Sequence, residues 1–219
     1  MQDAPKKRRK RPPLSPEGIE TAALALINRE GLAGFSMRKL GAELGCEAMS
    51  LYHYYPSMGH LMDALIDRIA RQYLPMPPAS LPWRERLRAF CIRWRAVALA
   101  NPGFFGFLAT HRMNTPTALR AIDGVIALIR EGTASDEEAA RLFRALGYYL
   151  MGAGLDETAG YSRGPSTVAP VPAAEMARDY PAVTAAAPWF APAAREATFL
   201  MGLDAFLDGW LGARGQPGV

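Results

Sequence analysis

Apolar residues recur at helical spacing in one segment of this chain after another, whereas the alternating pattern of a β-strand is scarce. Ser15-Pro16-Glu17 combines a capping hydroxyl, a proline and an acid in a first helical turn, and the apolar stripe that follows ends at Gly31. The sequence therefore predicts an all-α fold. Further helices are predicted at about 36–44, 47–54, 58–73, 83–100, 103–110, 116–131, 136–159 and 192–213.

Prolines mark the boundaries between the parts of the chain. A proline cluster at residues 75–82 separates an N-terminal domain, expected at residues 15–74, from a C-terminal domain, expected at residues 80–219. A segment rich in Ala and Pro between residues 160 and 192 predicts a long mobile loop with one short helix at most.

Positive charge is concentrated at the N-terminus. Residues 6–11 are all Lys or Arg and are followed by Pro12-Pro13, whereas the formal net charge of the whole chain is only +4. We expect residues 1–14 to form a disordered basic arm, which lies along phosphates or in a minor groove, or is only a solubilising tail. A nuclear-localisation signal is the least favoured interpretation.

Several classes of protein are disfavoured by what the sequence lacks. No run approaches the roughly 18 consecutive apolar residues of a membrane-spanning helix, and no apolar signal peptide opens the chain, so we expect a cytoplasmic protein without a membrane partner. Cys46 and Cys91 are expected to be reduced thiols, and together with the three histidines they lack the paired spacing of a zinc site, so no metal or cofactor is predicted. No nucleophile–base pair or phosphate loop is evident, so an enzyme is the less favoured alternative.

Two short helices at 36–44 and 47–54, joined through Gly45, have the layout of a helix-turn-helix DNA-binding unit. The second helix would read double-stranded DNA in the major groove, while Leu51 faces the core beside Leu40. The predicted DNA contacts are Arg38, Lys39, Ala48, Met49, Ser50, Tyr52, His53 and Tyr54.

The stretch YHYYP, residues 52–56, supports this interpretation. Because a helix turns about 100° per residue, its consecutive rings cannot all enter one core, and outward phenolic hydroxyls can donate to phosphate oxygens. The alternative is that Tyr54 and Tyr55 pack against neighbouring helices, which we expect for Tyr55. Arg38 is a phosphate contact or a solvated charge, and His53 is a DNA contact or only a surface residue.

Residues 36–65, SMRKLGAELGCEAMSLYHYYPSMGHLMDAL, resemble the DNA-binding domain of the TetR family of bacterial transcriptional regulators. In that family a capping Ser or Thr and a basic residue precede Leu-(Gly/Ala)-x-x-Leu-Gly-Val, then Leu-Tyr-x-(His/Tyr)-(Phe/Val) and a lysine-bearing turn. The resemblance implies that Arg38 and the candidates within 48–54 contact the operator. Cys46 replaces a small aliphatic residue, and Met58 stands where a lysine commonly holds phosphate.

The C-terminal half predicts a homodimer. One reading helix covers too little DNA for selectivity, so we expect two copies on a palindromic operator with half-sites about 34 Å apart. The apolar faces of the helices at 136–159 and 192–213 either pair with their copies in a four-helix bundle or form the chain's own core. The candidate interface residues are Leu142, Leu146, Phe199, Leu203, Phe206, Leu207 and Trp210.

Aromatic residues in this half exceed what a small helical core demands, which favours a ligand cavity walled by rings with a few polar groups. Core packing is the alternative for each of them, and the loop before Trp189 would serve as a lid. The candidate ligand contacts are Trp94, Phe104, Phe107, His111, Tyr148, Asp156, Trp189 and Phe190, with Arg112 and Asn114 as further polar groups.

This half also resembles the ligand-binding domain of the tetracycline repressors, in THRMNTPTALRAIDGVIALIREG, GYYLMGAGLDET and ATFLMGLDAFLDGWL. Leu108 and Leu74 stand where that group has histidines, the first of which helps to hold the drug-bound magnesium, and only Asp156 matches an acidic residue of the metal shell. The resemblance implies a ligand-responsive transcriptional repressor with a small apolar or aromatic effector. A DNA-binding dimer that responds to no small molecule is the alternative.

Overall fold

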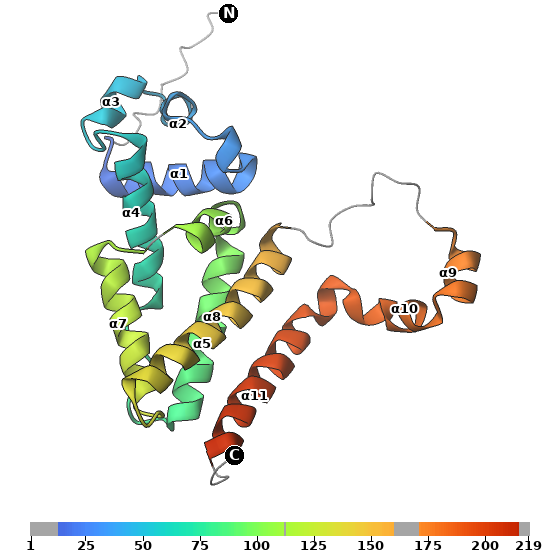
Figure 1. Cartoon of the computed structure of the whole chain (residues 1–219). Coiled ribbons are helices and arrows are strands. Elements are labelled where there is room, and N and C mark those ends of the chain that lie inside the picture. Colours follow the sequence, from blue (N-terminus) through green and yellow to red (C-terminus); the bar gives the residue numbers. More distant parts are fainter. Residues whose placement is uncertain (1–12, 112, 160–170, 215–219) are drawn as a thin grey trace, which may run out of the picture. The chain divides into compact units, whose positions relative to one another are not determined.

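The computed structural model describes residues 13–111, 113–159 and 171–214, and it divides into two compact units, one up to Leu65 and one from Ile66 onward (Figure 1). Every regular element in these residues is an α-helix or a short 3₁₀ turn, and no strand occurs among them. The all-α prediction is therefore confirmed. Most of the expected basic arm, Arg112 and the first part of the expected loop lie outside the described residues. Within the described residues, no helix is both long and apolar enough to cross a membrane.

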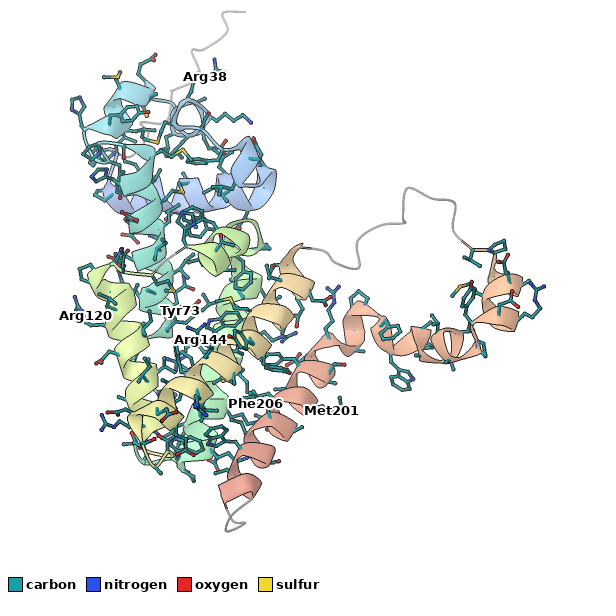
Figure 2. All side chains as sticks on the ribbon, in the orientation of Figure 1. Arg38, Tyr73, Arg120, Arg144, Met201 and Phe206 are labelled. Carbon is teal, nitrogen blue, oxygen red and sulfur yellow. The ribbon has the colours of Figure 1, made fainter. Side chains whose placement is uncertain are left out.

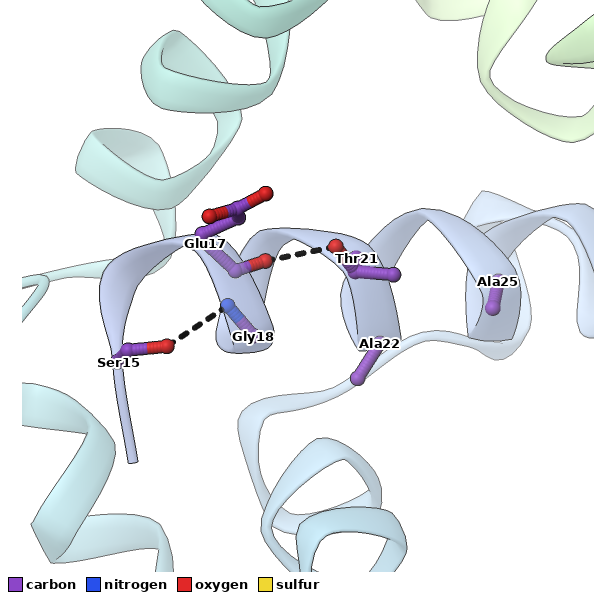
Figure 3. A pocket seen from close by; sticks show the side chains of 6 residues that line it. All are labelled: Ser15, Glu17, Gly18, Thr21, Ala22 and Ala25. Carbon is purple, nitrogen blue, oxygen red and sulfur yellow. Dashed lines mark hydrogen bonds between the residues drawn. The ribbon is translucent and has the colours of Figure 1, made fainter. Parts of the chain in front are cut away.

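The N-terminal unit opens with α1 (Pro16–Glu30), and its first turn shows why the helix begins there (Figure 3). The Ser15 hydroxyl accepts a hydrogen bond from the Gly18 amide at 3.2 Å, and the Thr21 hydroxyl donates to the Glu17 carbonyl at 2.7 Å. The first bond satisfies an amide that has no partner within the helix, and such a cap contributes about 1 kcal/mol. The predicted start of this helix matches the structure.

A 3₁₀ turn (Leu32–Gly34) leads to α2 (Met37–Leu44), α3 (Ala48–Tyr52) and α4 (Met58–Ala70), and the boundary between the units falls within α4. Their apolar stripes meet the stripe of α1 in one core, where each fully buried Leu or Ile contributes roughly 1.5–3 kcal/mol. The side chains of this core that are at most 1% exposed are Ile19, Ala23, Leu26, Ile27, Leu40, Leu51, Leu61 and Leu65.

The C-terminal unit begins with the last turn of α4 and a 3₁₀ turn (Arg71–Tyr73). The long helices of this unit are α5 (Trp83–Ala100), α6 (Pro102–Thr110), α7 (Pro116–Arg130), α8 (Asp136–Ala159) and α11 (Arg195–Arg214). α5, α6 and α7 all pack against α8, and α11 packs against α5 and α8. α8 is therefore the central helix, with Leu142, Leu146 and Leu150 buried at successive turns.

Two glycines let aromatic side chains pack directly against helix backbone. A Cβ at Gly154 of α8 would lie 2.5 Å from the Phe105 ring, and a Cβ at Gly202 of α11 would lie 2.6 Å from the Tyr149 hydroxyl. That hydroxyl donates to the Phe199 carbonyl at 2.6 Å. These contacts hold α6 and α11 close to α8.

Ion pairs also join the helices of this unit. Arg84 and Arg88 of α5 reach Asp204 of α11 at 3.2 and 2.8 Å, and the hydrogen bond from Arg88 lowers the pKa of the Asp204 carboxyl. Arg95 of α5 makes a two-pronged contact with Glu157 of α8 at 3.0 and 2.8 Å, and these side chains are only 16% and 7% exposed. Removing one partner of a buried pair costs about 3–5 kcal/mol, so the second contact matters more for stability.

The described part of the segment between α8 and α11 forms α9 (Ala173–Asp179), α10 (Pro181–Ala186) and 3₁₀ turns at Ala187–Phe190 and Pro192–Ala194. The sequence predicted one short helix at most in the loop, so the second helix and the turn at Ala187–Phe190 are additions. None of the side chains in these four elements is buried. The final helix begins three residues later than predicted, because the predicted first turn is a 3₁₀ turn.

Candidate nucleic-acid interface

The turn between α2 and α3 depends on two glycines. Gly45 has φ 67° and ψ 38°, the left-handed conformation that most residues avoid, and it ends α2. A Cβ at Gly41 would lie 2.8 Å from the Cys46 carbonyl oxygen and 3.2 Å from the Ala48 amide nitrogen. The Cys46 amide donates to the Gly41 carbonyl at 2.9 Å. The two glycines thus bring α3 close to α2 and fix the direction in which α3 projects.

α3 turns one side to the core and the other to solvent. Leu51 is fully buried, whereas Met49 is 70% and Tyr52 38% exposed. His53, which follows the helix, is exposed as well. The predicted outward side of this helix is therefore accessible. The two remaining candidates on α3, both half-buried, are Ala48 and Ser50.

The other tyrosines of YHYYP tie the end of α3 to the start of α1. Tyr55 is buried, and its hydroxyl lies 2.9 Å from a carboxylate oxygen of Glu20. The ring of Tyr54 is 41% exposed, but its hydroxyl donates to the Leu14 carbonyl at 2.9 Å. Tyr55 thus packs as we expected. Tyr52 is the one whose hydroxyl has no hydrogen-bond partner in the part of the chain that the structure describes.

The two basic candidates at the start of α2 differ in what they contact. Lys39 Nζ lies 2.7 Å from a Glu30 carboxylate oxygen and donates to the Gly34 carbonyl at 2.7 Å. The hydrogen bond from Lys39 lowers the pKa of the Glu30 carboxyl. Arg38 (labelled in Figure 2) is exposed and makes no hydrogen bond or ion pair with any described residue. Arg38 can reach a phosphate directly, whereas Lys39 would first have to leave Glu30.

The N-terminus of α4 is capped by its own side chains. Ser57 Oγ accepts a hydrogen bond from the His60 amide at 3.3 Å and lies 2.8 Å from His60 Nδ1. The Ser57 hydroxyl thus caps the helix, and its second contact, with the His60 ring, joins two side chains. Met58, 41% exposed, opens the helix where the family commonly has a lysine, so it brings no charge to a phosphate.

Four of the candidate ligand contacts lie on α5 or along α6. The rings of Phe104 and Phe107 are 5.1 Å apart between centroids, and the ring of Phe107 stacks on His111 at 3.4 Å. Trp94 of α5 meets Phe105 edge-on at 5.3 Å. α5 and α6 therefore gather aromatic side chains in one region of the C-terminal unit.

The other ligand candidates are not part of that group of rings. Tyr148, Trp189 and Phe190 are 68%, 74% and 69% exposed, and Asp156 is half-buried on α8. Trp189 lines a surface depression formed by its own 3₁₀ turn and the first turns of α11. Among the described residues, no three His, Cys, Asp or Glu side chains are placed to hold a metal ion.

Five of the candidate dimer residues are buried within one chain, so they leave almost no exposed surface for a second copy. They form the chain's own core, which is the alternative that the sequence left open. Phe206 and Trp210 are half-buried. In Figure 2, Phe206 is directed from α11 toward α8, and Met201 away from it. The five buried residues are Leu142, Leu146, Phe199, Leu203 and Leu207.

Two residues that position α3 were not among the predicted site residues. Glu20 lies between Ile19 and Ala23 on the core-facing stripe of α1, and a carboxylate at such a position signals a buried partner. Gly41 lies in the middle of a helix, where glycine weakens the helix and so indicates a close contact. Both signals were present in the sequence, but neither identifies the partner.

Two family models match the chain. The model described as bacterial regulatory proteins, tetR family, matches residues 19–65. The model described as the tetracyclin repressor-like C-terminal domain matches residues 74–212. Together they cover most of both units.

Curated relatives match over different lengths. The HTH-type transcriptional repressor DrrR1 of Streptomyces coeruleorubidus is 32% identical over 146 residues, which cover 65% of this chain and 53% of DrrR1. The chain therefore spans about half the length of that relative. The class A tetracycline repressor from transposon 1721 of Escherichia coli is 28% identical over 198 residues, which cover 90% of each chain.

Solved structures share the fold. ActR of Streptomyces coelicolor in complex with actinorhodin has a TM-score of 0.70 at 24% identity, covering 94% of this chain and 100% of ActR. BioQ with its double-stranded DNA operator has a TM-score of 0.57 at 22% identity, covering 68% of this chain and 91% of BioQ. At these identities the likeness shows the shared fold alone.

Proposed function

Because the chain belongs to the tetR family of bacterial regulatory proteins, we propose that it is a repressor that binds a palindromic operator as a homodimer and releases it when a small apolar or aromatic effector binds. Family membership confirms that the chain is a DNA-binding regulator and not an enzyme. The observation that carries the proposal is the exposed side of α3, where Met49 and Tyr52 face solvent while Leu51 anchors the helix.

In the proposed complex, the first residues of α3 reach base edges in the major groove, and flanking side chains hold phosphates. Tyr52 and Arg38 are suited to the second task, because both are exposed donors without a partner among the residues described. BioQ, which shares the fold, was solved with a DNA operator, and this supports the same use of the fold here.

A second copy is proposed to pack on the exposed sides of α8 and α11. Tyr148 and Leu155 lie about two turns apart on α8, and they are 68% and 41% exposed. Met201 of α11 is 69% exposed. A Cβ at Gly152 or Gly209 would have no heavy atom within 4 Å, so these helices leave room for close approach. Four helices from two copies would then form a bundle.

The aromatic residues of α6 are the proposed effector site. Phe104, Phe107 and His111 form a row of rings that runs from a buried position to an exposed one. A flat aromatic ligand can stack at the outer end of such a row, and each ring pair contributes about 0.5–1.5 kcal/mol. ActR was solved with actinorhodin, which makes that compound a suitable first probe.

A magnesium-bound tetracycline does not fit the residues present. Leu108 and Leu74 replace the two histidines of the tetracycline repressors, and an aliphatic side chain cannot bind a metal. Asp156 on α8 is the one matching acidic residue. We therefore assign no metal to the effector site.

Release of the operator requires that the effector site acts on α4. Thr115, which caps α7 just after the end of α6, donates a hydrogen bond to the Asp67 carboxylate on α4, and both residues belong to the C-terminal unit. A shift of α6 would pass through this bond to the last turns of α4 and so change the spacing of the two reading helices. A typical coupling of about 1–3 kcal/mol gives roughly 5- to 150-fold release.

The test begins by selecting duplexes from a random-sequence pool with the full chain. The expected result is enrichment of an inverted repeat, followed by release of the selected duplex on titration with actinorhodin, minocycline or other flat aromatic compounds. Without enrichment, the DNA-binding proposal fails. Enrichment without release by any compound would favour a regulator whose aromatic residues are only core.

A further inference from the structure

The outward side of α3 lacks the side chains that most often identify bases. From Cys46 to Tyr55 the sequence contains no Arg, Lys, Asn or Gln. Arg and Lys contact the two acceptors of guanine, and Asn or Gln contacts adenine, through paired hydrogen bonds in the major groove. α3 therefore cannot recognise a guanine or an adenine in this way.

Met49 occupies the position where such a side chain would act. It is the second residue of α3, near the end of the reading helix that contacts base edges, and it is 70% exposed. Ala48 beside it is small and half-buried, so it does not screen Met49 from an approaching duplex. An exposed thioether gains free energy mainly by covering apolar surface.

The major groove offers one such apolar group on the base edges, the C5-methyl group of thymine. Glu47, exposed just before α3, offers only acceptors, which can match amino groups of cytosine or adenine but not the methyl group. Tyr52 and His53 lie about one turn further along, on the side assigned to phosphates. Ala48 is also apolar but is half-buried and short, so Met49 is the most exposed apolar side chain at this end of α3 that fits the methyl group.

We infer that Met49 selects thymine at one position of each operator half-site by packing its side chain on the C5-methyl group. The inference rests on the proposed function, since it concerns how the same surface chooses its operator. Specificity at this base pair then comes from apolar contact, whereas Tyr52 and Arg38 add affinity without regard to sequence.

Deoxyuridine differs from thymidine only by this methyl group, so exchanging the two in a duplex isolates the contact. Burial of one methyl-sized group corresponds to about fourfold in affinity per half-site and about 15-fold when both half-sites are changed. The wild-type protein should bind the deoxyuridine duplex more weakly than the thymidine duplex by this factor. Met49→Ala should bind the two duplexes almost equally, and Met49→Leu, which keeps the apolar volume, should retain the difference.

Tyr52→Phe is the matched control. Because its hydroxyl is assigned to a phosphate, this variant should bind every duplex more weakly, while the ratio of affinities for the thymidine and deoxyuridine duplexes stays at the wild-type value. Met49 is largely exposed, so Met49→Ala should unfold at the same urea concentration as wild type.

The duplexes for this experiment are those selected by the full chain from the random-sequence pool, with thymidines replaced one position at a time. We expect that exchange of one thymidine per half-site weakens binding by the wild type, and that the same exchange leaves binding by Met49→Ala unchanged. The inference is overturned, while the DNA-binding function stands, if no exchange of thymidine for deoxyuridine lowers the affinity of the wild type. It is overturned equally if the exchange lowers the affinity of Met49→Ala as much as that of the wild type. If no duplex is selected, both fall together.

Discussion

Three neighbouring tyrosine hydroxyls have three different environments. Tyr55 bonds Glu20, Tyr54 bonds the Leu14 carbonyl, and Tyr52 has no partner among the described residues. The rings diverge as predicted, although only Tyr52 of the three lies within α3. Helical geometry could not predict which hydroxyl is satisfied internally, because the partners, Leu14 just before α1 and Glu20 within it, lie 40 and 35 residues away in sequence.

Tyr52→Phe should weaken operator binding about 3- to 10-fold per half-site, and so about 10- to 100-fold for the dimer, because it removes one hydrogen bond to a phosphate oxygen from each copy. The free energy of unfolding should not change, since the hydroxyl has no partner in the described part of the protein. Fluorescence anisotropy at fixed salt measures the first quantity, and urea titration measures the second. Equal affinity of the variant and wild type would contradict the assignment.

The two cysteines should differ sharply in reactivity. Burial raises the pKa of the Cys91 thiol to about 12, so the reactive thiolate is scarce at pH 8. Cys46 is half-buried in the turn before α3. Iodoacetamide should therefore modify Cys46 in the folded protein and Cys91 only after unfolding, as followed by mass spectrometry. Equal rates in the folded state would show that the α5 core opens readily.

Among the elements, those with strong local signals were predicted best. α8 has the predicted bounds, and α2 ends at Gly45 as its left-handed stop signal indicates. α10 was missed because a six-residue helix rich in alanine and proline has no apolar periodicity. The predicted helix at 47–54 is shorter in the structure, since the chain leaves the helix after Tyr52 to bring Tyr55 into the core.

Gly45→Ala should lower the free energy of unfolding by about 1–2 kcal/mol, because alanine pays for the left-handed conformation that glycine adopts freely. Gly45→Asn should lower the free energy of unfolding by less. Gly106→Ala is the control, since this exposed glycine within α6 has open space around it, and alanine there should leave the protein as stable or more stable. Urea denaturation measures the free energy of unfolding of each variant. If Gly45→Ala is as stable as the wild type, the left-handed conformation at this position does not require glycine.

The hydrogen bond between Thr115 and Asp67 is a contact between two elements, because it joins the N-terminus of α7 to α4. Thr115→Val should leave effector binding to the DNA-free protein nearly unchanged but reduce effector-driven release of the operator several-fold. The measurement is the operator affinity with and without saturating effector. A wild-type ratio in the variant would show that the signal takes another route.

For the whole molecule, the sequence predicted two functional halves but not which side of an amphipathic helix faces inward. The apolar stripe of α11 is wide enough to cover a core and a partner, and only packing against α5 and α8 shows that Leu203 and Leu207 are internal. Contacts between helices separated by 100 residues or more are not encoded in local periodicity. The interface with a second copy therefore remains a proposal.

Tyr148→Glu combined with Met201→Glu should convert dimers to monomers, because both side chains are exposed on the proposed contact surface and charge there would be buried without a partner. Val183→Glu, at an exposed position of α10, is the matched control and should leave the dimer intact. Sedimentation velocity gives the masses. A dimer that survives the double substitution places the interface elsewhere.

Hydroxyl-radical footprinting of a selected duplex bound to the full chain shows most directly whether the exposed side of α3 binds DNA in a two-fold symmetric dimer. We expect two protected regions related by two-fold symmetry, with centres about 34 Å apart on one face of the duplex. A single protected region, or two regions on opposite faces, would contradict this mode of binding.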